Sequence, residues 1–293
     1  MSEAPGSSEG LRSAKRTFAV VATTAFLAGA AGVVLTKKLA LEEPVLVRSD
    51  ALLESDPRAD RAARDAARLA LVAANESDAV AQLRSIAEAQ QMLQVSCAID
   101  TDGDGTGEFG YFAELAGTAP MRVRDPETGM AALGTDPEDL LDPPFLLSVF
   151  GQVAPDQTRG GVVEHGGYCF KIYLPDETIG GVTPGRPEDP RGGASPGDVG
   201  SDHWASANCE VLWCAYAWPV EVGETGVRVF MVNQEGEVVQ FDNPNATYEG
   251  LEMPPRFDAV YHDAVPRSMD QALGLKSSGR VANDGNLWTI VRG

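Results

Sequence analysis

The sequence lacks the short motifs that mark most kinds of chemistry. It contains no Cys-x-x-Cys pair, no Gly-x-Ser-x-Gly nucleophile turn, no P-loop and no dinucleotide-binding glycine fingerprint. These absences remove the usual sequence signs of thiol redox, serine hydrolase and nucleotide-binding proteins. Only three histidines occur in 293 residues, and His165, His203 and His262 all lie in loop-like segments. We therefore assign no catalytic residues and no organic cofactor.

Positive charge is also scarce. The chain has 23 Lys and Arg against 43 Asp and Glu, so its formal net charge is −20 and its pI is near 4.4. The phosphates of nucleic acid would be repelled by such a surface, which excludes nucleic acid as an expected partner. The acidic residues are spread along the chain rather than gathered in a tail, which is compatible with cation binding.

One long apolar run, Thr17–Leu35, contains no charged residue. As a helix it would span ~28 Å, close to the ~30 Å hydrocarbon core of a bilayer. Basic residues precede it, which favours a cytoplasmic N-terminus. We expect residues 17–36 to form a single-pass anchor in the inner (cytoplasmic) membrane, with the C-terminal domain outside the cytoplasm. The alternative is a signal peptide that is cleaved near Ala28-Gly29-Ala30.

The rest of the chain is expected to form a tail, a linker with one helix, and a folded domain. Residues 1–16 are rich in Ser, Gly and Glu and are expected to be a disordered cytoplasmic tail. Residues 37–76 are expected to form a juxtamembrane linker whose Ala/Arg-rich helix begins at Asp56-Pro57, an N-cap followed by proline. Residues 77–293 are expected to form an extracytoplasmic α+β domain.

The polar triplet Asn75-Glu76-Ser77 is expected to end the first helix near Ala74 and to cap a second helix, Asp78–Gln94. In this second helix, one face repeats at spacings of three and four residues, which predicts an amphipathic helix packed on a sheet. The members of that face are Val80, Leu83, Ile86, Ala87, Gln90 and Leu93.

Strand signals follow the helices in the sequence, an order that is typical of the α+β class. The expected strands are Gly167–Leu174, Glu210–Val220, Val227–Val232, Glu237–Phe241 and Leu287–Val291. The first alternates strongly, the second is apolar on both faces like a central strand, and the next two form a hairpin. We expect an amphipathic helix packed on an antiparallel sheet.

Two long stretches interrupt the strand pattern. Pro175–Asn208 is rich in Gly, Pro and Asp, and Asp242–Asn286 is mixed, with a short helix expected near Ser268–Leu275. Loops this long within a domain tend to be functional or mobile. We interpret both as surface insertions, and any ligand-binding or hydrolytic site is expected in loops 175–208 and 242–286.

The four cysteines form an even set in a chain that is expected to be exported. They are Cys97, Cys169, Cys209 and Cys214. Disulfides are therefore allowed, with three connectivities that the sequence does not distinguish. We expect disulfides or plain buried thiols in preference to a zinc site that would join His203 to Cys209.

The most specific motif begins at Asp100 and reads Asp-Thr-Asp-Gly-Asp-Gly-Thr-Gly-Glu-Phe. Aspartates at alternating positions can turn their carboxylates toward one centre, as in an EF-hand loop that binds Ca²⁺. The expected structural Ca²⁺ ligands are Asp100, Asp102, Asp104, the backbone carbonyl of Thr106, and Glu108.

Two positions depart from the EF-hand pattern. Gly107 replaces the usual apolar residue, and Tyr111 occupies the place of the final bidentate glutamate. Glu114 is a candidate substitute for that glutamate. The alternative is an acidic turn that binds no ion and is stabilised by contacts between Asp side chains and the backbone.

The order of an N-terminal membrane segment, an amphipathic helix that reads Ala-Val-Ala-Gln-Leu-Arg-Ser-Ile-Ala-Glu-Ala-Gln-Gln-Met-Leu, and an antiparallel sheet resembles type IV pilin-like and type II secretion pseudopilin-like proteins. The resemblance covers about residues 77–241 and implies a pilin-like head. The segment from Arg16 to Val20 lacks the Gly and Glu of a pilin processing site. This difference favours a plain membrane tether over a filament subunit.

Together these features predict a membrane-anchored extracytoplasmic structural or assembly protein of an uncharacterised bacterial kind, with a calcium-stabilised head. Its expected partners are the membrane, through residues 17–35, and either other envelope proteins or further copies of itself. One alternative is an exported ligand-binding or hydrolytic domain. Another is a secreted Ca²⁺-stabilised protein released by signal peptidase.

Overall fold

The computed structural model describes residues 57–129, 131–193, 205–262 and 267–292. Chain contacts define two units, Met1–Glu54 and Ser55–Gly293, and all described residues belong to the second. The expected tail at residues 1–16 and the expected anchor at residues 17–36 lie outside the described residues. Among the helices that the structure describes, none combines the length and the apolar character that a membrane span requires.

One continuous helix, α1 (Pro57–Ser96), replaces the two helices expected from the sequence. Its 40 residues span about 60 Å. The expected break at residues 75–77 is wrong because the side chains there bind another part of the fold. The Asn75 amide donates to the carbonyl of Thr225 at 2.8 Å, and Glu76 forms an ion pair with Arg228 at 2.6 Å. These side chains therefore do not compete for the backbone of their own helix.

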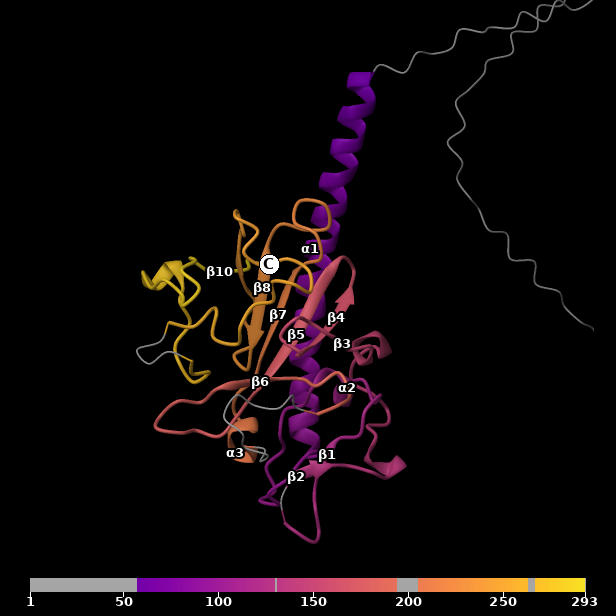
Figure 1. Cartoon of the computed structure of the whole chain (residues 1–293), viewed down its shortest axis with the longest axis vertical. Helices are drawn as coiled ribbons and strands as arrows, with labels where there is room; N and C mark the ends of the chain where they lie inside the picture. Colours follow the sequence, from indigo (N-terminus) through magenta and orange to yellow (C-terminus); the bar gives the residue numbers. More distant parts are fainter. Residues whose placement is uncertain (1–56, 130, 194–204, 263–266, 293) are drawn as a thin grey trace, which may run out of the picture. The chain divides into compact units, whose positions relative to one another are not determined.

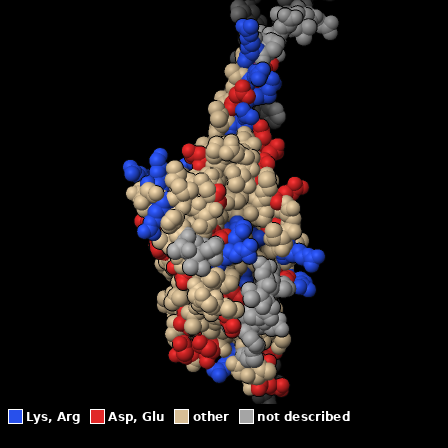
Figure 2. Space-filling view, turned by 60° about the vertical axis from the view of Figure 1, so that its left-hand side comes forward, with Lys and Arg blue, Asp and Glu red and all other residues tan. Residues whose placement is uncertain are grey.

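The two halves of α1 have different surroundings (Figure 1). Residues 58–71 are almost all exposed, and the relative solvent exposures of Leu69 and Leu71 are 66% and 53%. In the second half, every member of the predicted amphipathic face is buried, which confirms that face. Basic and acidic side chains alternate along the projecting half (Figure 2). We call residues 58–71 the arm of α1.

An eight-stranded sheet forms the centre of the unit, with neighbouring strands antiparallel throughout. Its main order is β10-β9-β8-β7-β5-β4-β3, and β6 pairs with β5. The strands are β3 (Ala154–Pro155), β4 (Gly161–His165), β5 (Tyr168–Pro175), β6 (Gly185–Pro187), β7 (Cys214–Pro219), β8 (Val229–Asn233), β9 (Val239–Phe241) and β10 (Thr289–Ile290). The predicted strands are confirmed, except that residues 210–213 precede β7 and follow the short helix α3 (Ser206–Cys209).

One face of the sheet packs on α1. Leu83 and Ile86 of the helix are fully buried in a cluster with Phe170, Ala215 and Phe230 of the strands. Burial of a Leu, Ile or Phe side chain contributes about 1.5–3 kcal/mol, so this cluster fixes the second half of α1 to the sheet. The α+β class is confirmed.

The opposite face of the sheet is covered by residues 242–262 and 267–288, which together with β10 we call the 242–290 layer (Figure 1). Tyr216 and Met231 of the strands pack there with Tyr248, Val260 and Trp288. Asp242–Asn286 is therefore a packed layer, and the expectation of a surface insertion is wrong. The short helix expected near Ser268–Leu275 is also absent, because this stretch is held by isolated bridges from Tyr261 to Leu273 and from Leu275 to Trp288. A short 3-10 turn, η3 (Lys276–Ser278), follows it.

The remaining elements lie between α1 and β3. They are α2 (Phe112–Leu115), the antiparallel pair β1 (Arg122–Arg124) and β2 (Ala131–Leu133), and the 3-10 turns η1 (Pro137–Asp139) and η2 (Ser148–Gly151). The acidic segment of residues 100–108, which we call the Asp100 loop, lies between the end of α1 and α2. It therefore joins the long helix to the part of the unit that contains α2, β1 and β2.

Candidate functional site

The carboxylates of Asp100, Asp102 and Asp104 converge just after the end of α1. One oxygen from each lies within 4.8 Å of the other two. Asp100 accepts hydrogen bonds from the amides of Gly103 and Gly105 at 2.8 and 3.1 Å, which wraps the loop around that carboxylate. Both glycines have positive φ, 75° and 91°, a conformation that other residues adopt at a cost. The loop thus offers the oxygen-rich group of ligands that Ca²⁺ prefers.

Gly107 explains one departure from the EF-hand pattern. A Cβ atom at this position would lie 1.9 Å from the carbonyl oxygen of Gln94. The loop passes so close to the last turn of α1 that the apolar residue of an EF-hand cannot be accommodated.

Glu108 does not join the three aspartates, in contrast to the sequence expectation. Its side chain is fully buried and forms an ion pair with Arg122 at 2.9 Å. Its other oxygen accepts hydrogen bonds from the Thr101 amide at 2.8 Å and from the Ser206 hydroxyl at 2.6 Å. The carboxylate is therefore directed into the core and is engaged by protein donors. The amide of Thr106 binds Asp104 at 2.7 Å, and the role of the Thr106 carbonyl stays a prediction.

Glu114, the candidate substitute ligand, is also directed into the core. One of its oxygens pairs with Nε of Arg122 at 3.0 Å, and the other accepts the amide of Tyr111 at 2.7 Å. Both glutamates near the loop thus neutralise Arg122 instead of approaching the aspartates. The sequence spacing alone could not show this, because Arg122 lies beyond the motif.

Glu210 is the acidic residue that the sequence analysis missed. Burial raises the pKa of its carboxyl group, and the negative charges of Asp104, Asp102, Glu108 and Asp100 raise it further. Its Oε1 atom is buried and has no hydrogen-bond partner among the described residues. A cation bound by the aspartates would offset the repulsion between these negative charges and that of Glu210. No local pattern could reveal Glu210, since it follows α3 and is remote from the loop in sequence.

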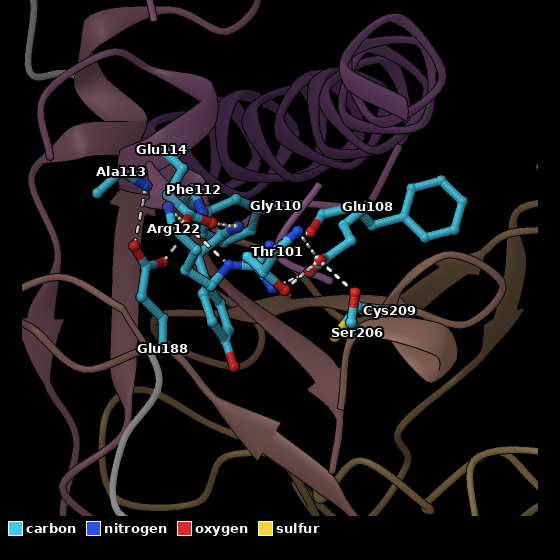
Figure 3. Close-up of polar contacts among 12 residues, drawn as sticks. Thr101, Glu108, Gly110, Phe112, Ala113, Glu114, Arg122, Glu188, Ser206 and Cys209 are labelled. Carbon is cyan, nitrogen blue, oxygen red and sulfur yellow. Dashed lines mark hydrogen bonds and ion pairs between the residues drawn. The ribbon is translucent and has the colours of Figure 1, made fainter. Parts of the chain in front are cut away.

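Arg122 is the centre of a buried polar network behind the loop (Figure 3). Besides Glu108 and Glu114, its guanidinium donates to the carbonyl of Phe109. Gln90 of α1 exchanges two hydrogen bonds with Gly110, at 2.7 and 2.9 Å. The network therefore ties α1, the Asp100 loop, α2, β1 and α3 together, so that the loop cannot change shape without disturbing the core.

The four cysteines are free thiols, and all except Cys97 are buried. Thiols are therefore found instead of disulfides, and three of the four are buried. Burial raises the pKa of Cys169 and Cys209 to about 12 and also raises that of Cys214. Because the thiolate is the reactive form, these three residues are poor nucleophiles.

We expect Ellman's reagent to modify one thiol per native chain, that of the exposed Cys97. Unfolding in urea without reductant should release the other three, which makes four in total. Fewer than four thiols after unfolding would show a disulfide, and rapid reaction of a second thiol in the native protein would contradict the described burial.

The described histidines form no catalytic group. Nε2 of His165 lies 3.9 Å from Asp78 in a partly exposed pair, and Nδ1 of His262 lies 2.9 Å from the carbonyl of Val281. His203 lies outside the described residues. In the part of the chain that the structure describes, the Asp100 loop remains the best candidate site. Comparison with protein-family models, curated proteins and solved structures finds no match to this chain.

Proposed function

We propose that this protein is a structural or assembly protein of the bacterial envelope, anchored through residues 17–35 in the cytoplasmic membrane. Its folded unit lies outside the cytoplasm. The observation that carries the proposal is the asymmetry of α1. Its second half is fixed to the sheet, whereas the arm presents Leu69 and Leu71 to solvent. A helix that continues beyond its own core is suited to connect a head to a tether or to a partner.

The head is pilin-like in this proposal. The support is the order of elements: an apolar segment, a long helix whose second half is amphipathic, and an antiparallel sheet packed on it. The buried stripe of α1 faces the central strands, as the pilin resemblance implies. The exposed arm is then the surface for self-assembly or for another envelope protein.

The head is calcium-stabilised in this proposal. The three converging carboxylates and the unsatisfied Glu210 oxygen support a cation site, with Asp100, Asp102 and Asp104 as ligands. Its role is structural because Thr101, between two of the ligands, and Glu108, which follows them, belong to the Arg122 network. A bound ion would fix the segment that follows α1 to the part of the unit that contains α2, β1 and β2.

We expect the expressed full-length chain to remain in the membrane pellet after alkaline carbonate extraction. Protease added to intact spheroplasts should digest the head. Leucine substitutions at Ala28 and Ala30, which block a signal-peptidase site, serve as the matched control and should leave the distribution unchanged. The tether is contradicted if the wild-type chain is soluble, if its mature N-terminus lies near Ala31, or if its head is protected.

A further inference from the structure

A cavity of about 510 Å³ lies in the 242–290 layer, on the sheet face opposite α1. This volume falls in the range of roughly 300–1,000 Å³ that is usual for small-molecule sites. The side of the unit that carries this layer is turned toward the viewer in Figure 2, where Lys and Arg form separate groups on a largely uncharged surface. We propose that the cavity binds a small organic oxyanion, a carboxylate or a phosphate ester, with an apolar body.

The acidic side chains that line the cavity are engaged by donors within the protein, Asp258 by an arginine and Asp284 by neutral groups. Both oxygens of Asp258 accept hydrogen bonds from Arg256, at 3.0 and 2.9 Å. Asp284 accepts the hydroxyl of Tyr248 at 3.1 Å, the amide of Asn286 at 2.9 Å and the indole N–H of Trp288 at 3.2 Å. The oxygens of both carboxylates are therefore already occupied by donors of the protein.

Two arginines supply the charged donors at the cavity. Nε and Nη2 of Arg256 hold Asp258, so its Nη1 edge is left for a ligand, and 59% of this side chain is exposed. Arg267 also lines the cavity, and among the described residues no carboxylate pairs with it. Guanidinium groups bind carboxylates and phosphates through paired, charge-assisted hydrogen bonds. Arg267 and the remaining edge of Arg256 thus offer such donors to an anion at one cavity, even in a chain of net charge −20.

The wall of the cavity is preorganised. The side chain of Asn243 holds the amide of Thr247 at 2.7 Å and the carbonyl of Tyr248 at 3.0 Å. Asn243, Ala246 and Arg267 have positive φ values of 46°, 48° and 72°. Such backbone conformations cost free energy and persist where the surrounding structure enforces them, often at ligand sites.

Apolar groups complete the lining and define the body of the ligand. Tyr248, Pro254 and Ala259 line the same cavity. A ligand that combines a planar or aliphatic body with one anionic group would satisfy the apolar wall and the arginines together.

The test uses the full-length protein in detergent and calorimetric titration at constant ionic strength. The probes are benzoate and phenyl phosphate, with benzamide as the neutral analogue. We expect saturable one-to-one binding of at least one anion and none of benzamide. The Arg267→Gln and Arg256→Gln variants should each weaken the binding by about tenfold. Binding of only one anion identifies the anionic group and supports the site.

Arg280→Gln is the matched control, because Arg280 is an exposed arginine of the same layer that does not line the cavity. It should bind the anions as the wild type does. The proposal is overturned if neither anion binds, if benzamide binds as tightly as the anions, or if Arg280→Gln weakens binding as much as Arg267→Gln. Melting temperatures of all variants confirm that a loss of binding is not a loss of fold.

Discussion

Replacing Arg122 with methionine is expected to lower the free energy of unfolding by about 3–5 kcal/mol, the usual cost of removing one partner of a buried ion pair. The guanidinium and the carboxylates of Glu108 and Glu114 are all fully buried, so water cannot replace it. Methionine fills a similar volume but leaves two negative charges unpaired. Urea unfolding at pH 7, analysed by linear extrapolation, measures the loss. A variant within 1 kcal/mol of the wild type at pH 7 would show that the Arg122 network does not hold the head together.

Two further variants separate charge from packing. Arg122→Lys keeps the charge but loses the forked contacts to both glutamates, so an intermediate loss is expected. Combining Arg122→Met with Glu108→Gln and Glu114→Gln removes the unpaired charges and should recover part of the stability.

The sheet could be predicted because its strands carry their own local signal. In β5, alternate residues face opposite layers: Phe170 and Ile172 pack toward α1, and Cys169 and Tyr173 pack toward the 242–290 layer. β7 is apolar on both faces because α1 covers one face and the 242–290 layer covers the other. Period-two alternation and length are properties of short segments, so they can be read without the rest of the fold.

The continuity of α1 through residues 75–77 could not be predicted from the sequence, because long-range contacts decide it. Asn75 and Glu76 would end an isolated helix, but their partners, Thr225 and Arg228, are some 150 residues later in the chain. The 242–290 layer was misinterpreted for a similar reason. It has little regular structure of its own, and its apolar residues acquire a role only when the sheet face is present.

The candidate site was predicted in part. The Asp100, Asp102 and Asp104 spacing implied convergence, and the structure brings these carboxylates together. Glu108 follows the same spacing but forms an ion pair with Arg122. Glu210, which follows α3, adds a further carboxyl group that interacts with the charges of the aspartates. Spacing within a motif can place neighbouring residues in one loop, but it cannot show which of them will pair with a buried arginine that is distant in the sequence.

Calcium is expected to raise the melting temperature of the full-length protein in detergent by about 5–10 °C. This expectation assumes a free Ca²⁺ concentration about 100 times the dissociation constant, which stabilises the folded state by about 2.7 kcal/mol. For a unit of this size, each kcal/mol raises the melting temperature by about 2–4 °C. The ion is expected to act on the whole head because the loop is joined to the Arg122 network through Thr101 and Glu108.

Asp102→Asn is the sharpest substitution in the loop. Its amide oxygen can still accept the amide of Asp104, which Asp102 holds at 3.2 Å, so the turn is kept while one charge is lost. The variant should fold in EDTA about as well as the wild type and lose most of its response to calcium. Asp242→Asn, at an exposed position outside the loop, is the control and should respond fully.

The calcium site is therefore tested by the melting temperature of the wild-type protein in 1 mM free Ca²⁺ and in EDTA, at equal ionic strength. We expect a higher melting temperature in calcium, with the difference abolished by Asp102→Asn and retained in Asp242→Asn. Equal melting temperatures in calcium and EDTA would show that the Asp100 loop is an acidic turn without an ion.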